Sequence, residues 1–188
     1  MYTGDDAMKM FEVVDEDQRQ ALAYATRAHA GQTRSSGDPY ISHPVRVANT
    51  VADQKKSKNI DALLSAAYLH DTIEDTDTTH EDLEKMFGGL VASLVQELTS
   101  DKAQIDKIGK AQYMAKKMTV MSSYALVIKL ADRLDNVQDI ATARTPEWRA
   151  RYKAETEHML KHIEQKRALT GTHQNIIKLI KDKINEVE

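Results

Sequence analysis

The chain has 188 residues, 41% hydrophobic and 29% charged, a composition typical of one globular domain with a buried core. The absence of Cys excludes disulfides, thiolate metal ligands and a cysteine nucleophile. A net charge of −3 offers no general attraction to nucleic acid, so we expect no nucleic acid as a partner.

With 7 Gly and 3 Pro among many strong helix formers, the sequence predicts an all-α protein. No apolar run approaches the roughly 20 residues that cross a bilayer, and the first residues lack the basic and then apolar order of a signal peptide. We therefore expect a cytoplasmic protein with no membrane partner.

The first predicted helix covers 15–29, and Gly31 is placed to end it. The stretch that follows, GQTRSSGDPYISHP, predicts an ordered loop because it is rich in Gly, Pro and Ser. This loop carries Arg34, Tyr40 and His43.

A second helix is predicted over 44–52. Pro44 suits a first helical turn, where its missing N–H would have no partner anyway. This position places His43 at the start of the helix, and the charged run after residue 52 indicates a solvated connector.

The stretch 62–75, ALLSAAYLHDTIED, organises the chain. It predicts an apolar helix that ends in His70, Asp71, Glu74 and Asp75. Since residues four apart share a helical face, we expect His70 to lie over Glu74 and Asp71 over Asp75. Taken alone, such a His-Asp pair is more often structural or solvated than metal-binding.

The middle of the chain carries weaker signals. Thr78 and Glu81 predict a capping box before a short helix that the glycines at 88–89 stop. Another helix is predicted over 90–98. The lysine-rich stretch 100–121 predicts a helix with a mobile loop, its lysines favouring the surface over the site.

The long helix predicted over 124–143, which Ser122 or Ser123 caps, has an apolar stripe typical of a core-facing helix. Beside it runs a polar row. A carboxylate next to a buried seam usually has a partner, which makes Asp132 a second candidate site residue. The stripe is Val127, Leu130, Ala131, Leu134, Val137 and Ala141, and the polar row is Lys129, Asp132, Arg133 and Asn136.

Two more helices are predicted over 146–169 and 172–187. We find no internal repeat, low-complexity tract or long linker. The sequence therefore predicts a single domain over 1–188, a helical bundle that the last two helices complete.

Two imidazoles and two carboxylates stand out as a set: His43, His70, Asp71 and Asp132. Such a set suits a first-row divalent ion and leaves coordination positions for water and substrate oxygens. At these residues the chain resembles the HD superfamily of metal-dependent phosphohydrolases, named for the adjacent His-Asp pair. The stretches GQTRSSGDPYISHP, AAYLHDTIEDT and IKLADRLDN further resemble the hydrolase domain of the RelA/SpoT homologues, over about 21–139.

The resemblance implies roles for particular residues. His43, His70, Asp71 and Asp132 would ligate the metal, usually manganese in this family. Glu74 and Asp75 would be the catalytic carboxylates. The implied substrate contacts are Arg34 and Asn136, and the Lys that often follows the loop arginine in the family is replaced by Ser35.

The implied function is that of a small alarmone hydrolase, which removes the 3′-pyrophosphate of (p)ppGpp to give GDP or GTP and pyrophosphate. Two alternatives stay open: the same chemistry on adenosine analogues such as (p)ppApp or on NADPH, which Ser35 favours slightly, and a non-catalytic helical module that senses a nucleotide. A homo-oligomer also stays open.

Overall fold

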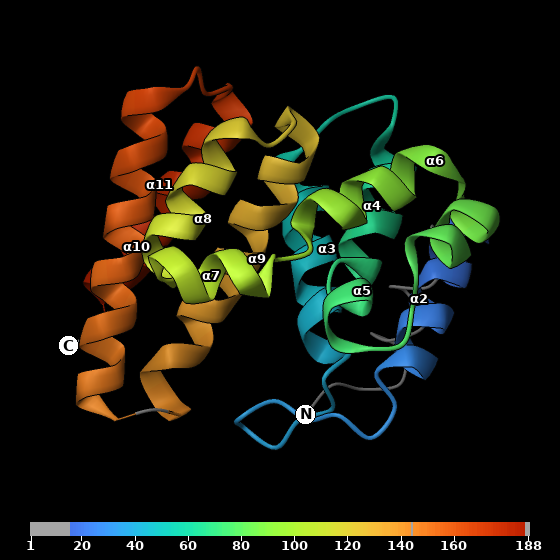
Figure 1. Cartoon of the computed structure of the whole chain (residues 1–188), viewed down its shortest axis with the longest axis horizontal. Coiled ribbons are helices and arrows are strands. Elements are labelled where there is room, and N and C mark those ends of the chain that lie inside the picture. Colours follow the sequence, from blue (N-terminus) through green and yellow to red (C-terminus); the bar gives the residue numbers. More distant parts are fainter. Residues whose placement is uncertain (1–15, 144, 187–188) are drawn as a thin grey trace.

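The computed structural model describes residues 16–143 and 145–186, without the side chains of 139–143. Within these residues the chain forms helices, turns and one isolated β-bridge, so the predicted all-α fold is confirmed (Figure 1). None of the described helices is both long and apolar enough to span a membrane. The helices are α2 (Glu16–Ala28), α3 (Ser42–Gln54), α4 (Ile60–Leu69), α5 (Thr72–Asp75), α6 (His80–Leu98), α7 (Lys102–Ile108), α8 (Lys110–Val120), α9 (Ser123–Ala143), α10 (Pro146–Lys166) and α11 (Gly171–Asn185).

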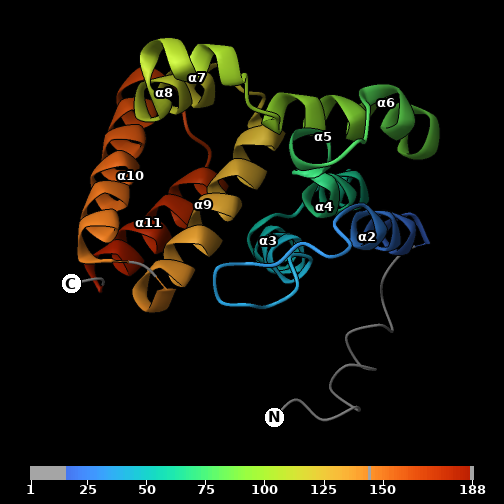
Figure 2. The ribbon, with the colours of Figure 1, turned by 60° about the horizontal axis from the view of Figure 1, so that its bottom comes forward.

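Helix α9 lies between two groups of helices. Both views place α2, α3, α4 and α6 on one side of it and α8, α10 and α11 on the other (Figures 1 and 2). It contacts α3, α4 and α6 in the first group and α10 and α11 in the second. Residues on α9 can therefore meet residues from much earlier in the chain.

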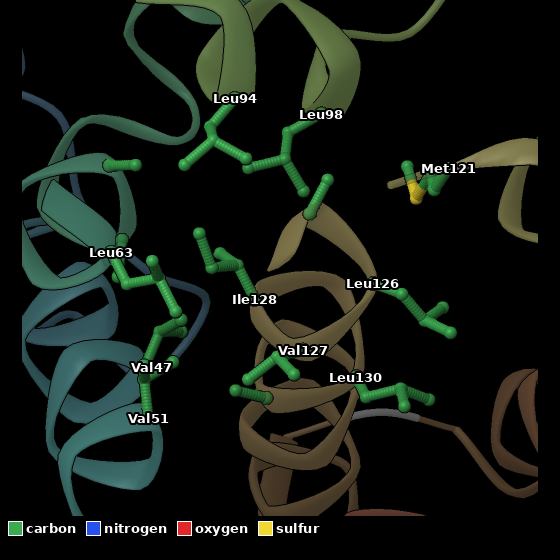
Figure 3. Packing of buried hydrophobic residues seen from close by; sticks show 14 of the residues in the cluster. Val47, Val51, Leu63, Leu94, Leu98, Met121, Leu126, Val127, Ile128 and Leu130 are labelled. Atoms are coloured by element: carbon green, nitrogen blue, oxygen red, sulfur yellow. The ribbon is translucent and has the colours of Figure 1, made fainter. Parts of the chain in front are cut away.

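The core fills the space around α9. Figure 3 shows Val127 and Ile128 of α9 directed towards α3 and α4, with Leu94 and Leu98 of α6 above them. Full burial of one such side chain is worth roughly 1.5–3 kcal/mol. Five residues of the predicted stripe are buried as expected: Val127, Leu130, Ala131, Leu134 and Val137. The sixth, Ala141, lies outside the described side chains.

The helix boundaries mostly follow the predicted signals. Gly31 has φ +81° after α2, and Gly88 has φ +82° at a kink that divides α6 into two segments. Both conformations favour glycine. The Ser122 hydroxyl accepts from the backbone N–H of Ala125 and caps α9. The last two helices also form, although residue 187 lies outside the described residues.

The predicted cap of α6 is wrong by one residue. The capping box uses Thr79 and Asp82 instead of Thr78 and Glu81. The reason is that the buried Thr78 hydroxyl lies 2.8 Å from the Thr76 hydroxyl and accepts from Tyr24. Thr78 thus anchors the preceding turn to α2, and Thr79 is left to cap the helix.

The predicted mobile loop within 100–121 is also wrong. Two helices, α7 and α8, occupy the segment, and Gly109 with φ +82° joins them. Helix α8 buries Met114 and Met118 and packs along α10. Helix α7 buries none of its residues, so it rests on the surface beside the site described next.

Candidate metal centre and active site

Three helices bring the predicted metal ligands together. His43 lies in the first turn of α3, His70 and Asp71 follow α4, and Asp132 lies on α9. His43 Nε2 is 3.2 Å from Asp132 Oδ1 and 3.7 Å from Asp71 Oδ2. His70 Nε2 is 3.0 Å from Asp71 Oδ2 and 3.9 Å from Asp132 Oδ1. All four side chains therefore converge on one point.

The helix predicted over 62–75 does not run unbroken through this point. Helix α4 ends at Leu69, residues 70–71 form a turn, and α5 starts at Thr72. Two side chains take carbonyls that a continuous helix would use. His70 Nδ1 donates to the Ala67 carbonyl at 2.8 Å, and the Thr72 hydroxyl donates to the Leu69 carbonyl at 2.7 Å. The stacking of His70 over Glu74 on one unbroken helix is therefore wrong. The Asp75 N–H still donates to the Asp71 carbonyl at 3.0 Å, so Asp71 lies one helical turn before Asp75 as expected.

The donor set fits a divalent metal. One ligand atom from each of His43, His70 and Asp132 lies within 4.8 Å of the others, and all three residues are buried. His70 Nε2 is buried and makes no hydrogen bond in the structure. A buried polar atom without a partner needs an explanation, and a lone pair directed at a cation supplies one.

Buried charges keep the two aspartates ionised. Burial alone raises the pKa of Asp132, but Lys129, whose Nζ is 2.7 Å from Asp132 Oδ2, acts together with His43 and His70 to outweigh burial and hold that pKa well below its usual range. Burial likewise raises the pKa of Asp71, and the neighbouring His70 outweighs it and lowers that pKa. Both carboxylates are thus available as anionic ligands at neutral pH.

Tyr40 is an additional residue at this cluster. Its hydroxyl donates to Asp71 Oδ2 at 2.5 Å. Burial first, and then the charge of Asp71, raises the pKa of Tyr40 far above its usual range, so the hydroxyl stays protonated and remains a donor. The sequence placed Tyr40 in the loop without a role, because the 31 positions between Tyr40 and Asp71 hide the contact.

The expected catalytic carboxylates lie at the same cavity. Glu74 Oε2 accepts from the backbone N–H of Ser100 at 2.8 Å, a contact between α5 and the segment that leads into α7. Partial burial, followed by the negative charges of Asp71 and Glu74, raises the pKa of Asp75. A carboxyl with a raised pKa is better suited to proton transfer near neutral pH.

The expected substrate residues are joined to each other and to the metal cluster. Arg34 Nη2 donates to Asn136 Oδ1 at 2.8 Å, although 102 positions separate the two residues. Asn136 Nδ2 in turn donates to Asp132 Oδ1 at 2.6 Å. The loop after α2 is thus tied to α9 beside the cluster.

A cavity of about 350 Å³ connects these groups, a size within the range of small-molecule sites. Lys102 and Lys110 are exposed, as the sequence predicted, yet they also line the cavity. Tyr152 was not predicted as a site residue; its ring stacks on Trp148, with ring centroids 4.9 Å apart, and lies 4.4 Å from the Arg133 guanidinium. The lining residues are Arg34, Tyr40, His43, Asp71, Glu74, Asp75, Ser100, Lys102, Ile105, Lys110, Met114, Lys129, Asp132, Arg133, Asn136 and Tyr152.

Comparison with known proteins places this geometry in a family. Residues 21–167 match the family model described as HD domain. The bifunctional (p)ppGpp synthase/hydrolase SpoT of Escherichia coli (strain K12) is 42% identical over an alignment of 143 residues that covers 73% of this chain. The chain spans only 20% of that relative's length.

Two further matches extend over most of both chains. The Homo sapiens protein named guanosine-3′,5′-bis(diphosphate) 3′-pyrophosphohydrolase MESH1 is 33% identical over 180 residues, covering 95% of this chain and 94% of that protein. A solved structure described as "A metazoan ortholog of SpoT hydrolyzes ppGpp and plays a role in starvation responses" has a TM-score of 0.78 and 29% identity, covering 92% of this chain and 96% of its own. The chain therefore belongs to the HD domain family.

Proposed function

We propose that this protein is a metal-dependent hydrolase that removes the 3′-pyrophosphate of (p)ppGpp, giving GDP or GTP and pyrophosphate. The observation that carries the proposal is one cavity lined by three of the four metal-type donors, with the buried His70 beside them, and by two further carboxylates and several cations. The named activity of the human relative, which aligns with nearly the whole chain, supports the same substrate.

In this proposal His43, His70, Asp71 and Asp132 hold the ion, with manganese as the expected metal. The chemistry that such an ion supplies when bound is polarisation of a phosphate oxygen and activation of water. Two neighbouring residues prepare the ligands for the ion: Lys129 helps to keep Asp132 ionised, and the Tyr40 hydroxyl donates to one oxygen of Asp71. Since His70 Nε2 has no hydrogen-bond partner, no protein contact must be broken there.

In this proposal Asp75 transfers the proton and Glu74 orients the attacking water. Asp75, whose pKa is raised, would take the proton from water and return it to the departing oxygen. Glu74 has one oxygen fixed by the Ser100 N–H, so the carboxylate is held in place to orient water with the other. Water is then directed at the phosphorus by side chains rather than by chance encounter.

The remaining cavity residues suit a nucleotide with two charged phosphate groups. Arg34 presents a flat guanidinium, which can stack on a purine or bind phosphate in a fork, and Asn136 holds it in position. Lys102 and Lys110 add two cations from α7 and α8 to the lining of the same cavity. These cations would offset substrate charge in a chain whose net charge is negative.

The test is pyrophosphate release from ppGpp by purified protein with Mn2+. The double variant Glu74→Gln with Asp75→Asn should lose at least 100-fold in turnover, because proton transfer by a side chain typically contributes about 10²–10⁴. It should still bind Mn2+. A matched control is Asp77→Asn with Glu81→Gln, two exposed carboxylates that do not line the cavity.

Turnover that survives the Glu74 and Asp75 changes would remove the role given to this pair. Wild-type protein that takes up no metal would instead support the alternative of a non-catalytic nucleotide sensor.

A second substrate class is favoured by one observation. Ser35 occupies the exposed loop position next to Arg34, where the resemblance leads one to expect Lys. Loss of that cation changes the contacts available to base or phosphate, which favours (p)ppApp or NADPH as candidates. Initial rates for ppGpp, ppApp and NADPH, measured side by side with Mn2+, decide between them, and a much higher rate with ppGpp would reject this class.

A further inference from the structure

The two imidazoles of the metal cluster are held in different ways. His70 donates from Nδ1 to the backbone carbonyl of Ala67, in the helix that precedes it. His43 has Nε2 directed at Asp132 and Asp71, and its other ring nitrogen, Nδ1, is 2.6 Å from Asp135 Oδ2. Asp135 lies one helical turn after Asp132, and its side chain is 2% exposed.

A second residue of α3 fixes Asp135. Arg46 Nε donates to Asp135 Oδ1 at 2.6 Å, and Arg46 Nη2 donates to Asp135 Oδ2 at 3.0 Å. Arg46 follows His43 by one turn of α3, and Asp135 follows Asp132 by one turn of α9. The four residues therefore join α3 to α9 by two parallel contacts, one at the metal cluster and one directly behind it.

We propose that Asp135 is a positioning residue for the metal centre, held by Arg46 and acting through His43. The inference rests on the proposed metal site. A carboxylate that accepts from Nδ1–H leaves the lone pair of His43 on Nε2, which is the nitrogen that faces the other ligands. It also sets the ring orientation and makes the imidazole a stronger donor to a cation.

The geometry argues against a simple surface ion pair between Asp135 and Arg46. Asp135 Oδ2 accepts from both Arg46 and His43, and it is buried while the Arg46 side chain is 38% exposed. An ion pair alone would need neither the burial nor the shared oxygen. Hydrogen bonds to a buried carboxylate fix its position more firmly than exposed contacts do.

The test is Mn2+ affinity of metal-stripped protein, measured by calorimetric titration without substrate. Asp135→Asn keeps the shape of the side chain but removes its negative charge and replaces one accepting oxygen with an NH2 group, which only donates, so the side chain can no longer accept all three hydrogen bonds from His43 and Arg46. We expect a 10–100-fold weaker Kd for Mn2+. Arg46→Gln, which keeps the carboxylate but removes its second anchor, should give a smaller loss.

A matched control is Asp61→Asn, which also removes a carboxylate that accepts a hydrogen bond. Asp61 accepts from Gln18 at 2.7 Å and does not line the cavity. Its Mn2+ affinity should equal that of wild type. Co2+ supplies a second readout, because its visible absorption reports ligand geometry. The Co2+ spectrum should change in Asp135→Asn and stay unchanged in Asp61→Asn, which a purely structural role for Asp135 would not produce.

Wild-type affinity and an unchanged Co2+ spectrum in both Asp135→Asn and Arg46→Gln would overturn the positioning role and leave the proposed hydrolase intact. Wild-type protein that binds neither Mn2+ nor Co2+ would overturn both. If Asp135→Asn does not fold, Arg46→Gln decides the question alone, and wild-type affinity in that variant would reject the proposal.

Discussion

Arg167 ties the end of α10 to the end of α8 and provides a quantitative test of the fold. Its Nη1 donates to the carbonyls of Met118 and Met121, at 2.8 and 2.9 Å, with a longer contact of 3.4 Å to Thr119. The last carbonyls of a helix have no partner within the helix, so Arg167 completes the C-terminus of α8. A cation at that position also interacts favourably with the helix dipole.

The expected cost of Arg167→Ala follows from these contacts. One NH2 group has two hydrogens, so it makes two good hydrogen bonds at a time. Removing a charged donor costs about 1.5–3 kcal/mol for each bond when its partners stay buried. Arg167 is only half-buried, so water can bind the freed carbonyls and reduce this cost. We expect a loss of about 2 kcal/mol in the free energy of unfolding, which lowers Tm by roughly 4–8 °C in a chain of this size.

Urea denaturation at 25 °C, with Tm as a second measure, checks this value. Lys166→Ala is the matched control, because it removes an exposed cation from the same helix end and should change stability by less than about 0.5 kcal/mol. Arg167→Lys should recover part of the loss, since an ammonium group lacks the planar fork. A loss in Arg167→Ala no larger than that in Lys166→Ala would refute the reasoning.

Three further outcomes are expected. Burial lowers the pKa of His173, whose neutral Nδ1 accepts from the Thr170 N–H. The stability that neutral His173 contributes is therefore complete above pH 6.5 and is lost as the pH falls. His173→Gln, which also suits a capping box, should reduce the difference between the denaturation midpoints at pH 7.5 and 5.5, and an unchanged difference would contradict this. Tyr40→Phe removes the hydroxyl bound to Asp71 and should weaken the Kd for Mn2+ about 10-fold by calorimetry, whereas Tyr24→Phe, whose hydroxyl contact is 3.3 Å long, should not. EDTA should lower Tm relative to protein with Mn2+ at 100 times its Kd, because such binding stabilises by about 2.7 kcal/mol; equal melting curves would argue against a metal site.

The sequence by itself determined most of the helices and the order of the site residues. Helical periodicity and end signals are local features of the sequence. For this reason α2, α3 and α9 form where the pattern predicts them, and the predicted glycine lies at the kink of α6. The set of His43, His70, Asp71 and Asp132 was also recognisable, because chemically distinctive residues recur in a fixed order in the HD motif. The roles of these residues, the single domain, self-association and cytoplasmic location remain predictions.

Only the tertiary structure decided how the site is held. The turn at residues 70–71 depends on side chains that take the Ala67 and Leu69 carbonyls, a competition that periodicity does not reveal. Asp135 and Tyr40 acquire their partners across 92 and 31 positions, through packing of α3 against α9 and folding of the loop. Lys102 and Lys110 look like ordinary surface residues until α7 and α8 bring them to the cavity wall. Contacts of this kind arise from the packing of whole helices, so no local pattern in the chain encodes them.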